Sequence, residues 1–166
     1  MTVAACIVPV NPATARPSLV RAEIERQASG TMEDWQQAIV AECGKHASLC
    51  RPVLDYLKRT GLLSRCVLLA AEPGGPLLWR FIGQTTVKYM GSAWARSNLG
   101  RPAEADERTD FGRVLAASYA EALDIRAPVV NQLRVSGLAR PLDYQHTLLG
   151  WQDASGTRAV LSCVHA

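Results

Sequence analysis

The sequence predicts a single α+β domain in which helices come first and strand hairpins come later. Apolar residues recur at helical spacing in the first third of the chain. Two pairs of strand-like segments then each flank a short turn containing glycine. The chain has 166 residues, of which 48% are hydrophobic and 20% are charged, a balance typical of a globular domain large enough to bury a core.

Composition argues against several classes of partner and location. The net charge is only +3 and the basic residues are scattered, so we expect no nucleic-acid binding. The longest apolar run, 66–71, is far shorter than a membrane helix, and residues 1–10 do not resemble a secretory signal. Five cysteines without a C-x-x-C pair do not indicate a disulfide framework. We therefore predict a soluble cytoplasmic protein with no membrane contact.

Three helices are predicted before residue 61. Residues 1–15 carry prolines among small residues and indicate an extended arm. A helix capped by Ser18 is expected over 18–28, and a second is expected to begin at Thr31. A third should begin near Pro52 and stop at Gly61, because proline suits a first helical turn and glycine suits a helix end.

A hairpin and two short helices are predicted next. The runs 66–72 and 77–84 are strand-like, and the Pro-Gly-Gly-Pro segment 73–76 between them indicates a tight turn. Residues 85–98 are expected to form one or two short helices interrupted at Gly91.

The last part of the chain indicates a long helix and three strands. After a polar loop at 99–107, Thr109 can cap a helix whose apolar series comprises Phe111, Val114, Leu115, Tyr119, Ala122 and Leu123. An extended segment at 129–135 follows. Strands at 142–151 and 158–164 then form a closing hairpin.

The stretch Trp79-Arg80-Phe81-Ile82-Gly83, followed by Gly91, forms an aromatic-R-x-x-G … G pattern. This pattern resembles that of a bacterial PAS-like family of stand-alone sensory and regulatory proteins. The glycine of Gly100-Arg101-Pro102 resembles the next glycine of the same family pattern. The segment 142–151, with Gly156 and a final apolar strand, resembles the closing hairpin. The order of two strands, a helical crossing and three strands is also that of a PAS domain.

The resemblance covers about 54–164, with two departures. The interval from Gly91 to Gly100 is longer than usual, and Gly150 stands where the family tends to have proline. The resemblance implies a five-stranded antiparallel sheet with flanking helices, a ligand cavity between sheet and helices, and dimerisation through N-terminal helices. We accordingly divide the chain into an arm with N-terminal helices (1–60), serving packing or dimerisation, and a PAS-like domain (61–166).

An aromatic cavity is the candidate binding site. Strand alternation places certain side chains on the inner sheet face, where they would meet aromatic residues of the helices. Apolar walls with a few polar groups are typical of ligand cavities, although the same residues could simply fill a core. The cavity candidates are Trp79, Phe81, Tyr89, Trp94, Leu115, Tyr119, Tyr144 and His146.

Metal binding has weaker support. His146 could ligate haem or titrate near neutrality, but a histidine in a strand is more often hydrogen-bonded or solvated. Cys43, His46 and Cys50 would share a face of a continuous helix, yet no fourth ligand lies nearby in the sequence. We predict no metal site and leave the cofactor unassigned.

The sequence favours a non-catalytic sensory or regulatory module. None of the common nucleophile, metalloprotease or nucleotide-binding motifs occurs, and the acidic cluster around Arg108 suits a helix start. We expect binding of a small ligand or a regulatory protein partner, with a homodimer signalling through rearrangement of N-terminal helices. Two alternatives stay open. One is a small α+β cone enzyme resembling NTF2-like isomerases and dehydratases, with Tyr144 or His146 orienting substrate; the other is an interaction domain with a solid core.

Overall fold

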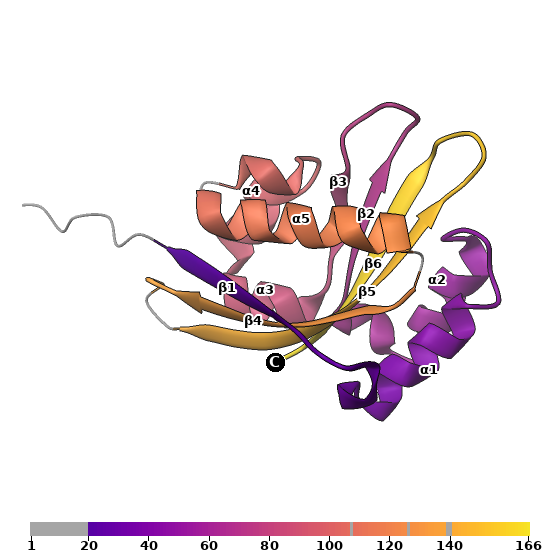
Figure 1. Ribbon diagram of the computed structural model, residues 1–166, viewed down its shortest axis with the longest axis horizontal. Helices are drawn as coiled ribbons and strands as arrows, with labels where there is room; N and C mark the ends of the chain where they lie inside the picture. The colour runs from indigo at the N-terminus through magenta and orange to yellow at the C-terminus, as the bar shows by residue number, and fades with distance from the viewer. Residues whose placement is uncertain (1–19, 107, 126, 139–140) are drawn as a thin grey trace, which may run out of the picture.

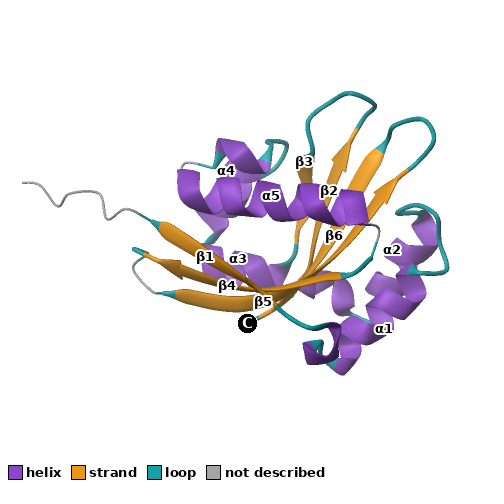
Figure 2. Cartoon of the chain, in the orientation of Figure 1, coloured by secondary structure: helices purple, strands orange, loops and turns teal. Residues whose placement is uncertain are grey.

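Six antiparallel strands form one sheet, and helices pack on both of its faces (Figure 1, Figure 2). The computed structural model describes residues 20–106, 108–125, 127–138 and 141–166. The predicted arm and the Ser18 cap lie outside these residues. The sheet order is β1-β4-β5-β6-β2-β3. The strands are β1 (Arg21–Arg26), β2 (Cys66–Ala71), β3 (Leu78–Ile82), β4 (Val129–Ser136), β5 (Leu142–Gln152) and β6 (Arg158–His165).

Three helices cover the inner face of the sheet. They are α3 (Gln84–Met90), α4 (Ser92–Asn98) and α5 (Thr109–Ile125), with a break between the first two at Gly91, whose φ is +94°. The long helix α5 lies across β5, where its backbone closely approaches Gly150. Its predicted apolar series faces the core, with Phe111 and Leu115 each 2% exposed. The two short helices, α5 and both predicted hairpins are confirmed.

The outer face carries a second, separate apolar core. It is covered by α1 (Asp34–Cys43) and α2 (Arg51–Arg59), which lie at the lower right of Figure 1 and pack against β5 and β6. Ile39, Val53 and Leu57 are fully buried against the sheet. Because both faces are covered, β2 is a nearly continuous run of buried apolar residues rather than an alternating one.

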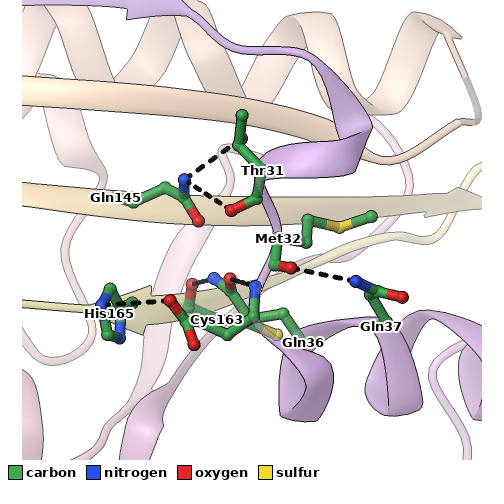
Figure 3. A network of polar contacts seen from close by, with 8 residues as sticks. Thr31, Met32, Gln36, Gln37, Gln145, Cys163 and His165 are labelled. Carbon is green, nitrogen blue, oxygen red and sulfur yellow. Dashed lines mark hydrogen bonds and ion pairs between the residues drawn. The ribbon is translucent and has the colours of Figure 1, made fainter.

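Polar contacts fix the start of α1 on the sheet (Figure 3). Gln36 is fully buried, and its Nε2 donates to the Cys163 carbonyl in β6 at 3.1 Å. The Glu33 backbone N–H donates to Gln36 Oε1 at 3.0 Å, which completes a capping box. Nearby, Gln145 Nε2 donates to both oxygens of Thr31 at 3.3 Å. The cap of α1 is thus Glu33, three residues from its buried glutamine, and not Thr31 as the sequence predicted.

The predicted helix at 18–28 is wrong where the structure describes it. Residues 21–26 form strand β1, which pairs with β4 and places Ile24 opposite Leu133. In this segment Ala22 and Ile24 alternate with charged residues, a period-2 pattern that suits an edge strand better than a helix. The sheet therefore has six strands instead of five, and the segment before residue 61 contributes a strand as well as helices. None of the described helices is both long and apolar enough to cross a membrane.

Candidate functional site

A small aromatic cavity of about 30 Å³ lies between the inner sheet face and α3, α4 and α5. Seven of the eight predicted residues line it. They are Trp79, Tyr89, Trp94, Leu115, Tyr119, Tyr144 and His146. Phe111, Ser162 and Val164 also contribute. The volume is enough for about two or three water molecules, since each needs roughly 10–15 Å³.

Phe81 is the predicted residue that does not reach the cavity. The pairing of β2 with β3 shifts register, so that Leu68 faces Phe81 while Leu69 faces Trp79. The extra residue is a β-bulge, which breaks strict alternation and turns Phe81 away from the face that carries Trp79. Phe81 packs against the outer core instead. Simple i, i+2 counting could not find this shift.

Three aromatic rings form the centre of the site. Trp79 makes edge contacts with Trp94 and Tyr119, at ring-centroid distances of 5.7 Å and 5.8 Å. Edge-to-face pairs of this kind are each worth about 0.5–1.5 kcal/mol beyond their buried area. The Trp79 indole Nε1 and the Thr86 Oγ1 are buried without a hydrogen-bond partner. Both residues belong to the lining of the cavity.

The titratable groups of the cavity are held neutral by burial. His146 is 1% exposed, and burial, with a smaller effect of Arg26, lowers its pKa to about 3. Asn131 Nδ2 donates to its Nε2 at 3.2 Å, which fits the neutral ring. Burial also raises the pKa of Tyr144 and, with the neighbouring Tyr144, the pKa of Tyr119. A cavity of this size has no room for haem, and the His146 Nε2 already accepts a hydrogen bond from Asn131.

Asp106 is a residue that the sequence did not single out for the site. It is 4% exposed, and its Oδ2 accepts the Trp94 indole N–H at 2.7 Å. Its Oδ1 accepts the Arg108 backbone N–H at 2.8 Å. The acidic cluster expected to be solvated is thus partly internal, and Asp106 fixes one wall of the cavity. Only the spacing of Trp94 and Asp106 across a polar loop could have indicated this.

The thiol and imidazole candidates do not converge. The helix α1 ends at Cys43, so His46 and Cys50 do not continue its face. Burial, with smaller contributions from Cys66, Glu42 and Cys50, raises the pKa of the Cys43 thiol to about 12. Among the described ranges there is no group of three or more His, Cys, Asp or Glu side chains suited to a metal ion.

Comparisons with known proteins give no relatives: no family model, no curated protein and no solved structure matches this chain. The fold and the contacts above establish a mixed α+β protein with a six-stranded antiparallel sheet.

Proposed function

We propose that this chain is a non-catalytic sensory or regulatory module, PAS-like in fold, that binds a small neutral ligand in its aromatic cavity. The segment from β2 to β6 supports the likeness: two strands, a helical crossing on one face and three strands, all in one antiparallel sheet. The departures are the added strand β1 and the helices α1 and α2 on the outer face.

The observation that carries the proposal is the Trp79 indole N–H. Trp79 lines the cavity and is only 2% exposed, and no described residue accepts the hydrogen bond of its buried indole N–H. A buried donor without an acceptor costs about 1–3 kcal/mol, so a ligand that brings an acceptor gains that amount on binding. Because His146 and the tyrosines are neutral, a neutral acceptor suits the site better than an ion.

Strand β6 connects the cavity to the outer helices. Ser162 lines the cavity, whereas the next residue, Cys163, accepts the Gln36 side chain from α1. A ligand larger than the present 30 Å³ must push on these walls. We propose that it acts by binding more tightly when α1 and α2 are shifted, since only differential affinity moves such an equilibrium. The same proposal includes homodimerisation, through a surface other than the one that α1 and α2 pack against the sheet, and a cytoplasmic location.

A catalytic role has less support from the same geometry. A cone-type isomerase or dehydratase would need an acid among the cavity residues, and the described lining contains no Asp or Glu. Asp143 lies on the other face of β5, 59% exposed and 3.6 Å from the Arg134 Nε. The arrangement therefore favours binding over proton transfer.

The test compares ligand binding by the Trp79→Phe variant with ligand binding by the wild type. Native mass spectrometry and absorbance of gently purified protein, followed by a thermal-shift screen of small neutral aromatic acceptors, would detect a ligand. We expect Trp79→Phe to bind the ligand about fivefold or more weakly than the wild type, because it lacks one hydrogen bond. Trp35→Phe alters the outer core instead and should bind as the wild type does. Equal binding by all three proteins, or no ligand for the wild type, would contradict the proposal. Sedimentation velocity would check the dimer.

A further inference from the structure

Two cysteines of the outer core lie directly opposite each other on neighbouring strands. Cys66, the first residue of β2, pairs with Cys163 in β6, and each is 0% exposed. The Cys163 carbonyl is also the group that Gln36 of α1 binds (Figure 3). The two cysteines are far apart in the sequence, so the pairing of β2 with β6 brings them together.

The backbone hydrogen bonds make this a non-hydrogen-bonded pair. The Gly83 N–H donates to the Cys66 carbonyl at 2.8 Å, so the backbone groups of Cys66 face β3 rather than β6. The Asp153 N–H donates to the Thr157 carbonyl at 3.1 Å, and Cys163, an even number of residues further on, faces β5 in the same way. In such antiparallel pairs the Cα atoms are about 4.5 Å apart and the side chains are at their closest.

This geometry fits a disulfide bond. Disulfides span Cα separations of about 4.4–6.8 Å, a range that includes the separation expected for this pair. The two thiols also interact directly: a hydrogen bond with the Cys66 side chain, together with burial, raises the pKa of the Cys163 thiol. The other cysteines are placed differently, since Cys43 ends α1, Cys50 precedes α2, and Cys6 lies outside the described residues.

We propose that Cys66 and Cys163 form a reversible cross-strand disulfide when the protein meets hydrogen peroxide. The Cys66 sulfur attacks one peroxide oxygen, the O–O bond breaks, and Cys66 becomes a sulfenic acid with release of one water. The Cys163 sulfur then attacks the Cys66 sulfur, and the S–O bond breaks to release a second water. The two thiols together lose two electrons and two protons. This modification does not depend on ligand binding in the aromatic cavity.

The turn that precedes β2 is the route by which the oxidant reaches the pair. The Cys66 Sγ donates to the Leu62 carbonyl at 3.3 Å, and no residue of the turn Leu62–Arg65 is buried. Because a buried thiol is unreactive, oxidation waits for this turn to open, which exposes far less surface than global unfolding. We therefore expect a slow reaction whose rate changes by less than about twofold in about 1 M urea, since urea acts in proportion to the surface exposed.

The experiment treats the full chain with hydrogen peroxide, alkylates the remaining thiols and maps the disulfides by peptide mass spectrometry. We expect a Cys66–Cys163 crosslink as the main product, with full reversal by dithiothreitol. Because this bond closes a long loop, the thermal midpoint of the oxidised protein should rise by at least about 3 °C. The proposal would be overturned by five free thiols after prolonged treatment, by a main crosslink through Cys6, Cys43 or Cys50, by a lower midpoint, or by a rate that urea raises about tenfold or more.

Variants assign the effect to the two named thiols. Cys66→Ala and Cys163→Ala should each abolish the rise in thermal midpoint on oxidation. Cys50→Ala is the matched control, because it removes a partly exposed thiol next to α2 and should keep the rise. If a variant of the pair does not fold, the wild-type peptide map decides. A rise that survives in folded Cys66→Ala or Cys163→Ala would overturn the assignment.

Discussion

The Gln36 side chain joins α1 to the sheet through a hydrogen bond from its Nε2 to the Cys163 carbonyl, 3.1 Å long and wholly buried. The Gln36 side chain lies beside the outer core, whose apolar members are aliphatic, aromatic and thiol groups. Because the same amide also caps α1 through Glu33, one residue sets both the start of the helix and its position on β6.

Replacing Gln36 by leucine should therefore destabilise the protein. The Cys163 carbonyl and the Glu33 N–H each lose a partner, and we expect the free energy of unfolding to fall by about 1–3 kcal/mol. Urea denaturation measures the change. Gln37→Leu is the matched control, because Gln37 is exposed and should cost less than about 0.5 kcal/mol. Equal effects would mean that the buried amide does not hold α1.

Gly150 should tolerate no side chain. A Cβ built on it would lie 2.5 Å from the Ala122 carbonyl carbon in α5 and closer still to its oxygen. Gly150→Ala must push α5 off β5, at a cost of about 1–3 kcal/mol. Gly30→Ala has open space around it and should stay within about 0.5 kcal/mol of the wild type. Thermal and urea unfolding compare the two.

Much of this fold could be predicted from the sequence, because its signals are local. The Pro-Gly-Gly-Pro turn, Gly91 and the apolar series of α5 each act within a few residues. Strand β1 could not be predicted as readily, because its conformation depends on the free edge of β4, more than a hundred residues away.

The residues of the candidate site were likewise predictable only where the signal in the sequence was local. Residues at regular strand or helix spacing reached the cavity, whereas Phe81 was misplaced by a bulge that depends on pairing with β2. Asp106 was missed because its role comes from a tertiary contact with Trp94. Alternation and periodicity carry no information on either feature.

His146 should make the protein sensitive to mild acid. Its pKa is lowered to about 3 in the folded state, whereas an unfolded histidine titrates near 6.5. Below pH 6.5 the unfolded chain takes up a proton that the folded chain refuses, so stability present at neutral pH is lost as the pH falls toward 3. The slope should approach about 1.4 kcal/mol per pH unit between pH 6 and 4.

His146→Gln should flatten that slope, whatever its effect on stability at pH 7. Urea unfolding at pH 7.0, 6.0, 5.0 and 4.5 provides the comparison. Glu42, Asp110 and Asp153, whose pKa values are lowered by hydrogen bonds, begin to lose their own contribution below about pH 5, but they do so equally in wild type and variant, so the difference in slope isolates His146. His165→Gln, at the exposed end of β6, is the control. A slope unaffected by His146→Gln would contradict the burial of a neutral ring.

The bond between Trp94 and Asp106 should be the main polar support of the Trp94 ring, which lines the aromatic cavity. It joins a buried indole N–H to a buried carboxylate at 2.7 Å, and hydrogen bonds to charged groups contribute about 1.5–3 kcal/mol. Asp106→Asn keeps the shape but offers one acceptor oxygen to two N–H donors, so one bond is lost and the other loses its charge, and the free energy of unfolding should fall by about that amount. The exposed Glu104→Gln should change little.

A double-mutant cycle separates this bond from the packing of the ring. Trp94→Phe removes the donor, and combining it with Asp106→Asn should cost less than the sum of the single changes, with a coupling energy of about 1 kcal/mol or more. Additive costs would show that the ring is held by Trp79 and Phe111 instead, which it contacts at 5.7 Å and 6.4 Å between ring centroids.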